Sequence, residues 1–117
     1  MQLTRDHTLV QDLIQQGMPP LAPSERLVGG HWITNAIGGN GLGVRVDVHK
    51  LTLEPGDVLL LATDGLTNEL TDQRIASVLA AESDPEIACN HLMAETLEHG
   101  GHDNVTVIIA RYETATD

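Results

Sequence analysis

Residues 57–66 read Asp-Val-Leu-Leu-Leu-Ala-Thr-Asp-Gly-Leu, and this stretch decides the fold. The apolar run from Val58 to Ala62 is short enough to form a strand that is buried on both faces. Residues 54–57, Glu-Pro-Gly-Asp, provide a turn signal before it. The run ends just before Asp64 and a glycine, where a carboxylate is favourable in a turn but costly if it is buried unpaired. Asp64 is therefore expected to face either water or a cation.

The rest of the chain predicts a domain that mixes helices with antiparallel strands. Valines alternate with polar residues over 44–49, which predicts a half-buried strand that runs to about Leu53. This strand is expected to form an antiparallel hairpin with the strand at 58–63. Capping signals and periodicity predict the remaining elements: a helix over 9–16, helices over 71–81 and 85–99, and a last strand over 105–112.

The charge of the chain argues against a nucleic-acid partner. Its 117 residues suit a single domain and carry a formal charge of -11, from 6 basic and 17 acidic residues. Proteins that bind phosphate backbones concentrate Lys and Arg instead. Trp32 and Tyr112 are the only aromatic residues that could stack on bases. An acidic chain of this kind is compatible with divalent cations.

Cysteine content and hydropathy favour a cytoplasmic protein. Cys89 is the only cysteine, which excludes an internal disulfide and a cysteine-rich zinc site. The sequence begins without a charged and then apolar leader, and no apolar run reaches membrane-spanning length. These features predict a soluble protein of a reducing compartment, with no membrane partner.

A second carboxylate stands at the start of the last predicted strand. Residues 100–104 read Gly-Gly-His-Asp-Asn and lead directly into this strand, as Asp64 follows the earlier one. If the two strands are neighbours, Asp64 and Asp103 converge on one rim of a sheet. Two carboxylates held close raise each other's proton affinity unless a cation lies between them. Oxygen ligands of this kind suit magnesium or manganese.

These carboxylates also have simpler interpretations. Asp-Gly and Asp-Asn are common turn dipeptides, and each alone is more often a plain turn than a ligand. Asp6 and His7, taken alone, favour a helix cap over a metal site. No histidine is expected to pair with a carboxylate four positions along a helix, which would mark a zinc site. Cys89 is interpreted as a small core residue.

Five segments, in this order, carry a resemblance to a known family. They are Leu-Thr-Arg-Asp-His-Thr at 3–8, Ile-Thr-Asn-Ala-Ile-Gly at 33–38, Leu-Glu-Pro-Gly-Asp at 53–57, Leu-Leu-Ala-Thr-Asp-Gly-Leu at 60–66 and Gly-Gly-His-Asp-Asn-Val-Thr-Val at 100–107. The order and spacing resemble bacterial metal-dependent protein phosphatases of the PPM, or type 2C, family. The resemblance covers nearly the whole chain.

The resemblance implies an α+β fold and a metal site. Members form a four-layer α-β-β-α sandwich, in which two antiparallel sheets are flanked by helices, with two manganese or magnesium ions at one edge. Asp64 matches the metal-binding aspartate of the family's Asp-Gly motif, and Asp103 matches that of the terminal Asp-Asn motif. Asp6 is similar to an aspartate that can hold a third ion together with the Asp-Gly aspartate. Residues 18–30 resemble the flap beside the site.

The resemblance also implies an activity. Members of the family hydrolyse phosphoserine and phosphothreonine in proteins, through a metal-activated water that attacks phosphorus in line, and no phosphoenzyme forms. Phosphorylated proteins are the implied substrates, and a serine/threonine kinase is an implied signalling partner.

The sequence departs from the family pattern in a way that affects the predicted activity. It contains neither the family's phosphate-gripping arginine segment nor its Asp-Gly-x-Gly-Gly motif, whose aspartate bridges both metals. Residues 38–43 lack Asp, and Asn35 stands where many members have Arg. Residues 1–117 are therefore predicted to be the C-terminal half of one phosphatase domain.

A half-domain of this kind is expected to be inactive alone and to leave strand edges and apolar faces uncovered. Self-association, or binding of the N-terminal half, is the predicted consequence. Two alternatives remain at this point. One is a non-catalytic, truncated interaction module or relic, and the other is an acidic domain whose Asp-Gly and Asp-Asn are only turns.

Overall fold

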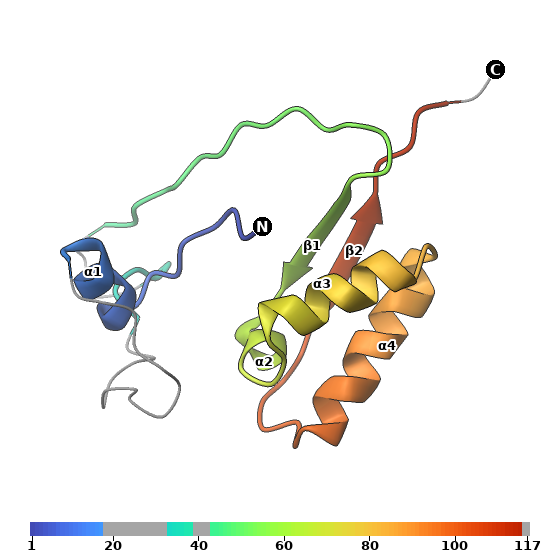
Figure 1. The fold of residues 1–117 in the computed structure, drawn as a ribbon. Coiled ribbons are helices and arrows are strands. Elements are labelled where there is room, and N and C mark those ends of the chain that lie inside the picture. The colour runs from blue at the N-terminus through green and yellow to red at the C-terminus, as the bar shows by residue number, and fades with distance from the viewer. Residues whose placement is uncertain (18–32, 39–42, 116–117) are drawn as a thin grey trace. The chain divides into compact units, whose positions relative to one another are not determined.

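The computed structural model describes residues 1–17, 33–38 and 43–115, and it divides the chain into two units, 1–51 and 52–117. Figure 1 shows the fold. The helices and strands, in chain order, are α1 (Leu9–Gln15), β1 (Val58–Ala62), α2 (Asp64–Thr67), α3 (Asp72–Ala81), α4 (Pro85–Glu98) and β2 (Val107–Arg111).

Strand β1 pairs with the last strand of the chain. The antiparallel register runs from Val58 opposite Arg111 to Ala62 opposite Val107. The turn at 54–57 lies beside the end of this ladder, where the Gly56 N–H donates to the Tyr112 carbonyl at 2.8 Å. Gly56 has φ +92°, a value that favours glycine and fits the turn signal in the sequence.

The predicted hairpin between residues 44–53 and β1 is wrong. Residues 43–53 form no strand, and Val46 is 78% exposed. Alternation of side chains selects an extended backbone, but a strand also needs a partner for its backbone hydrogen bonds. Strand β1 receives that partner from β2, which comes from the far end of the chain.

Helices α3 and α4 begin at the capping residues that the sequence predicts. The Thr71 side chain accepts from the Arg74 N–H at 3.2 Å, and Asp84 Oδ1 accepts from the Glu86 N–H at 2.8 Å. Pro85 follows this second cap at the first helical position, where its missing N–H is not needed. Local sequence signals are therefore sufficient to set where both helices begin.

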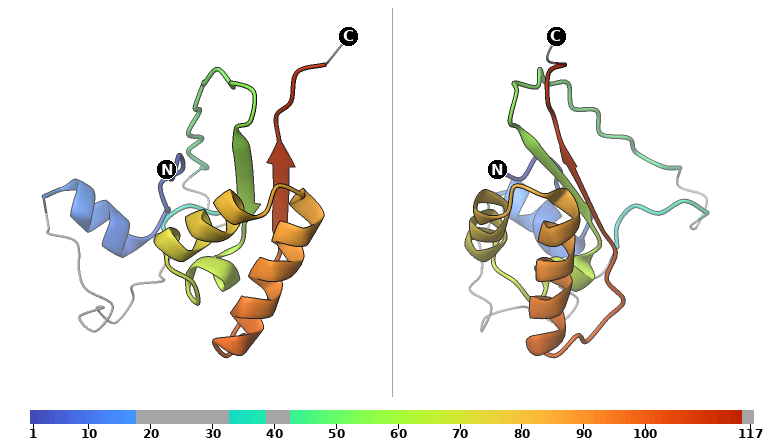
Figure 2. Two further views of the ribbon diagram at one scale, coloured as in Figure 1. Left: turned by 45° about the vertical axis from the view of Figure 1, so that its right-hand side comes forward. Right: turned by 90° about the vertical axis from the view of Figure 1, so that its right-hand side faces the viewer.

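The core of the 52–117 unit is aliphatic and lies between the helices and one face of the sheet. Figures 1 and 2 show α3 and α4 on the same side of both strands. The buried hydrophobic residues come from the three helices and the turn after α2: Leu66, Leu70, Ile75, Val78, Ala88 and Leu92. Leu60, Val107 and Ile109 pack against this cluster from the strands.

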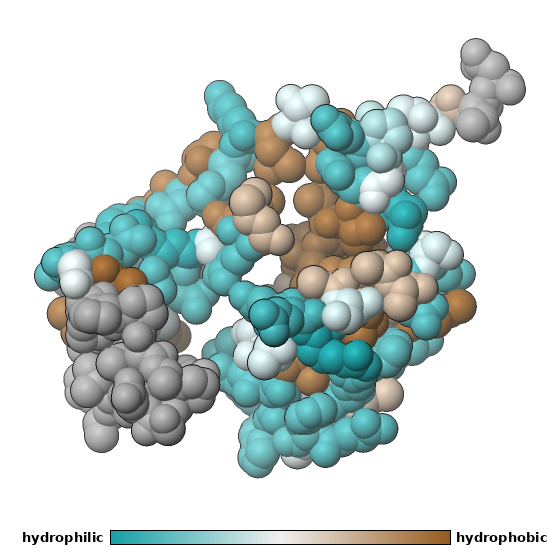
Figure 3. Space-filling model, in the orientation of Figure 1, coloured by the Kyte–Doolittle hydropathy of each residue, from teal (hydrophilic) through white to brown (hydrophobic). Residues whose placement is uncertain are grey.

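The opposite face of the sheet carries exposed aliphatic side chains. Leu61 is 60% exposed and Ile108 is 57% exposed, and these two residues face each other in the ladder. A hollow of about 180 Å³ lies there, lined by Leu61, Ala62, Thr63, Thr106 and Ile108. Figure 3 shows the other side of the sheet, the side of α3 and α4, where brown hydrophobic atoms are visible beside the helices and the lower part of α4 is mostly hydrophilic. The described residues of this unit cover one face of the sheet, so the expectation that residues 58–62 are buried on both faces is wrong.

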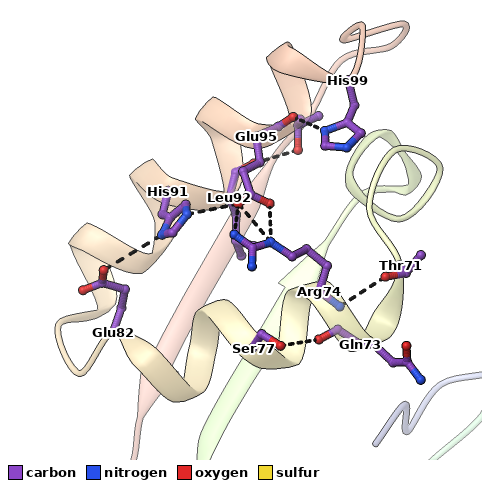
Figure 4. A network of polar contacts seen from close by, with 10 residues as sticks. Thr71, Gln73, Arg74, Ser77, Glu82, His91, Leu92, Glu95 and His99 are labelled. Atoms are coloured by element: carbon purple, nitrogen blue, oxygen red, sulfur yellow. Dashed lines mark hydrogen bonds and ion pairs between the residues drawn. The ribbon is translucent and has the colours of Figure 1, made fainter.

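A polar network joins α3 to α4 on their outer side (Figure 4). The Arg74 guanidinium donates to both carboxylate oxygens of Glu95, with Nε–O distances of 3.0 and 2.9 Å. His91 Nε2 lies 3.1 Å from Glu95 Oε1 on the same helix. The hydrogen bonds from Arg74 lower the pKa of Glu95 from its ordinary value of 4.5 to about 2.

The pairing of His91 with Glu95 contradicts the expectation that no histidine has a carboxylate four positions along a helix. This spacing lies within the helix predicted over 85–99, so that expectation was wrong from the sequence itself. In the structure Arg74 also binds the Glu95 carboxylate, so the pair belongs to an ion-pair network between two helices. A zinc site would need that carboxylate free and further ligands nearby.

The 1–51 unit contains helix α1, whose N-cap is Thr8 rather than Asp6. The Thr8 hydroxyl oxygen accepts from the Gln11 N–H at 3.2 Å. Gly17, with φ +108°, follows the helix and supplies the left-handed backbone conformation that commonly ends one. The predicted flap at 18–30 and residues 39–41 lie outside the described residues. Within the described ranges, none of the helices combines the length and apolarity that a membrane crossing requires.

Candidate functional site

The end of β1 and the approach to β2 meet at Thr63. The Thr63 N–H donates to the Thr106 carbonyl at 3.0 Å, and the Thr106 N–H donates to Thr63 Oγ1, also at 3.0 Å. The Thr63 hydroxyl donates to the Asn104 carbonyl at 3.4 Å. These bonds continue the strand register past Ala62 and set the residue before Asp64 against the residue after Asp103.

Gly65 lets the two segments approach closely. A Cβ atom at this position would lie 2.2 Å from the Asn104 carbonyl oxygen, and real Cβ atoms do not come so near. The sequence predicts only a turn at Asp64-Gly65, whereas the structure begins a one-turn helix there, α2, in which the Asn68 N–H donates to the Asp64 carbonyl at 2.8 Å. The glycine thus permits close approach of helix and loop.

Asp64 and Asp103 both have exposed side chains at these converging ends. Asp103 Oδ1 accepts from the Asn104 N–H at 2.7 Å. No Lys, Arg or His among the described residues forms an ion pair with either carboxylate. Two carboxylates on adjoining segments, without a protein cation to neutralise them, fit the oxygen donor set of a hard divalent ion.

The donor set is nevertheless partial. No three His, Cys, Asp or Glu side chains of the described residues are grouped so that they could hold a metal ion together. Magnesium and manganese sites take about six ligands, several of them often waters. Asp64 and Asp103 can therefore supply part of such a site, and the remaining ligands must come from water or from other residues.

Glu69 and His102 join the same two segments one turn away. Glu69 Oε1 accepts from His102 Nδ1–H at 2.6 Å and from the His102 backbone N–H at 3.3 Å. These hydrogen bonds lower the pKa of Glu69. No local sequence signal marks either residue as part of the site. A contact between positions 33 residues apart depends on the pairing of β1 with β2, which sequence periodicity does not reveal.

In the 1–51 unit, Asp6 is an exposed residue beside a hydrogen-bonded histidine. His7 Nε2–H donates to Asp47 Oδ2 at 2.8 Å, while His7 Nδ1 accepts from the Asn35 side-chain amide at 2.8 Å. The bond from His7 lowers the pKa of Asp47. The structure therefore brings the segments of Asp64 and Asp103 together, whereas Asp6 belongs to the other unit.

The Asn35 side chain also forms two hydrogen bonds with the Arg45 backbone, one as donor and one as acceptor. Its amide donates to the Arg45 carbonyl at 2.7 Å, and its carbonyl oxygen accepts from the Arg45 N–H at 3.1 Å. An arginine at this position could donate but could not accept. The departure from the family pattern at this position thus coincides with a local hydrogen-bond arrangement that needs an amide.

Comparison with known proteins confirms the family resemblance. Residues 8–113 match the family described as stage II sporulation protein E (SpoIIE). A Streptococcus pyogenes protein whose name assigns it to the protein phosphatase 2C type is 30% identical over 112 residues, which are 96% of this chain and 45% of the relative. The protein phosphatase PhpP of Streptococcus pneumoniae is 32% identical over 108 residues, which are 92% of this chain and 44% of PhpP.

Among solved structures, the serine/threonine phosphatase of S. agalactiae matches with a TM-score of 0.82 and 34% sequence identity. The match covers 94% of this chain and 46% of that phosphatase. The mixed helix and strand architecture therefore matches part of a phosphatase of this kind. The chain spans less than half the length of each of these relatives.

Proposed function

This chain belongs to the SpoIIE family, and we propose that it is the C-terminal half of a type 2C domain that hydrolyses phosphoserine and phosphothreonine in proteins. One observation carries the proposal. The close approach of Gly65 to the Asn104 carbonyl holds the Asp-Gly and Asp-Asn segments together at the end of one strand pair. Each segment carries an exposed carboxylate, Asp64 or Asp103, and carboxylate oxygens are ligands that hard divalent ions take.

In this proposal, Asp64 and Asp103 bind a manganese or magnesium ion, one of two in the complete site. Asp6 contributes to a third. A bound divalent ion supplies a Lewis acid that generates a nucleophilic water near neutral pH. The role of the chain is to hold the two carboxylates in place, through the hydrogen bonds of Thr63 and the close packing at Gly65.

The exposed face of the sheet supports the four-layer sandwich as the complete fold. Leu61 and Ile108 are the kind of residues that a second sheet would cover, because aligned sheets pack through their aliphatic side chains. We expect the chain alone to self-associate or to bind the other half of the domain through this face. Dynamic light scattering that finds a monodisperse monomer with cooperative melting would contradict this expectation.

The decisive experiment is manganese binding and hydrolysis of an aryl phosphate by the purified chain. Calorimetric titration with Mn²⁺ should detect binding that is lost in Asp64→Asn and in Asp103→Asn, with Asp84→Asn as a control carboxylate that caps α4. Equal Mn²⁺ binding by all four proteins would overturn the proposed site. Hydrolysis that depends on both aspartates would show that copies of this chain complete the site without another half.

A second candidate function is a non-catalytic interaction module that retains the fold. It is favoured by the absence of an Asp-Gly-x-Gly-Gly motif from the 117 residues. A chain that binds Mn²⁺ but hydrolyses no substrate, even after a separate N-terminal half of a related phosphatase is added, would support this candidate. Hydrolysis restored by that half would support the first. Substrate phosphoproteins, a kinase partner and a cytoplasmic location accompany the first candidate.

A further inference from the structure

Glu69 is an acidic residue that is nearly removed from water beside the proposed metal site. It follows α2, and its N–H donates to the Leu66 carbonyl at 3.1 Å. Only 10% of its side chain is exposed, whereas 79% of the His102 side chain is exposed. The carboxylate is therefore the fixed partner, and the exposed loop at 100–104 is attached to it.

Without contacts to other segments, the backbone of the 100–104 loop could adopt many conformations. Gly100 and Gly101 both have positive φ, +122° and +54°, and reverse the chain after α4. A Cβ at Gly100 would lie 2.3 Å from the His102 ring, so the imidazole occupies the space beside this glycine. Two consecutive glycines make the segment conformationally permissive, so contacts beyond its own backbone must select one conformation.

Two such contacts lie on either side of Asp103. Before it, His102 binds Glu69 through both its ring and its backbone N–H. After it, the Asn104 carbonyl accepts from the Thr63 hydroxyl. Both partners belong to the short segment 63–69 that contains Asp64. The positions of Asp64 and Asp103 relative to each other are thus fixed from both sides.

We propose that Glu69 is a positioning residue which, by holding His102, sets Asp103 against Asp64 for shared metal binding. The metal in this inference comes from the proposed function. The placement of the 100–104 loop by Glu69 does not depend on that proposed function. Glu69 Oε1 accepts two hydrogen bonds from His102, and these bonds are the basis for assigning Glu69 a role that acts through His102. Residues that orient ligands in this way typically contribute roughly 10- to 100-fold to metal affinity.

An exposed ion pair commonly contributes little to stability. The Glu69–His102 pair differs because one partner is nearly buried and also accepts a backbone N–H. The Arg74–Glu95 pair in the same unit provides a matched comparison, because it joins two helices by charge and lies on neither segment of the proposed site. Its loss should affect stability without affecting metal affinity.

The test combines Mn²⁺ titration with amide hydrogen exchange on the 117-residue chain and its Glu69→Ala, Glu69→Gln and Arg74→Gln variants. Glu69→Ala should weaken Mn²⁺ binding by roughly 10-fold or more. Glu69→Gln retains an oxygen that accepts from His102 and should recover most of the affinity. Arg74→Gln should bind Mn²⁺ as the unmodified chain does.

Exchange measurements in the absence of metal test the geometry separately. The His102 amide should exchange faster in Glu69→Ala, and the Gly65 and Asn104 amide resonances should shift. Unchanged amides in this variant would overturn the positioning role, whatever the metal result. An equal loss of affinity in Arg74→Gln would also overturn it. A chain that binds no Mn²⁺, with Glu69→Ala amides altered as expected, would overturn the proposed function and leave the geometric role standing.

Discussion

Each of the two units of the chain is stabilised internally by a different kind of interaction. In the 52–117 unit, Leu66 and Leu92 are fully buried in an aliphatic cluster between helices and sheet. In the 1–51 unit, no residue whose side chain the structure describes is buried, and side-chain hydrogen bonds around Asn35 connect three segments. A core gains free energy from area removed from water, whereas exposed polar bonds exchange protein partners for water. The two units should therefore respond to different perturbations.

The largest expected effect is loss of core volume in the 52–117 unit. Leu92→Ala removes a side chain with no exposed surface and should lower the free energy of unfolding by about 2–5 kcal/mol. Urea denaturation followed by circular dichroism measures this change. Ile87→Ala, on the exposed side of the same helix, is the control and should change stability much less. Equal effects of the two variants would contradict the assignment of this cluster as the core.

The next effect concerns the close contact between α2 and the loop before β2. Gly65→Ala places a methyl group where the Asn104 carbonyl oxygen lies and should destabilise the unit by about 1–3 kcal/mol. It should also weaken Mn²⁺ binding, because the two carboxylate segments must separate. Asn68→Ala, at the exposed end of the same short helix, tests whether any change in α2 has this result. An unperturbed Gly65→Ala variant would show that the two segments do not touch.

A smaller effect should be confined to the 1–51 unit. Asn35→Arg removes the acceptor for the Arg45 N–H and should cost about 1 kcal/mol of local stability, seen as faster exchange of that amide. Asn35→Asp keeps an acceptor oxygen and should preserve protection of the same amide. Protection of the Leu92 and Val78 amides should stay constant in both variants. Loss of that protection would show that the two units are energetically coupled.

The smallest effect is a pH dependence in the 52–117 unit. Because Arg74 lowers the pKa of Glu95 from 4.5 to about 2, the pair stabilises the folded chain above pH 4.5, and this stabilisation is lost as the pH falls toward 2. The midpoint of urea unfolding, measured across this pH range, should fall less steeply in Glu95→Gln than in the unmodified chain. Identical slopes would mean that Glu95 titrates normally. Added salt should weaken the contribution of this pair, because the Arg74 side chain is about half exposed.

Several helix starts, one strand and the two aspartate motifs of the candidate site can be predicted from local sequence. Thr71 and Asp84 begin their helices where capping chemistry predicts, and residues 58–62 form a strand as their apolar run predicts. The motifs around Asp64 and Asp103 indicated the family, which the comparisons bear out. Such features are readable because their physical causes lie within a few residues of one another.

Other features depended on partners far along the chain. The valines at 44–48 alternate as a strand should, yet they remain exposed and unpaired in a ladder among the described residues. Glu69 and His102 carry no local signal, and neither do Arg74 and Glu95. Each of these contacts requires two distant segments to be placed first.

The sequence by itself determined which residues form β1, α3 and α4, and it placed a carboxylate after one strand and before another. Only the tertiary structure decided that β1 pairs with β2, which brings Thr63 and Gly65 against Asn104. The physical reason is the range of the forces. Capping and periodicity act within a turn or a strand, whereas strand pairing and core packing depend on which distant surfaces are buried together.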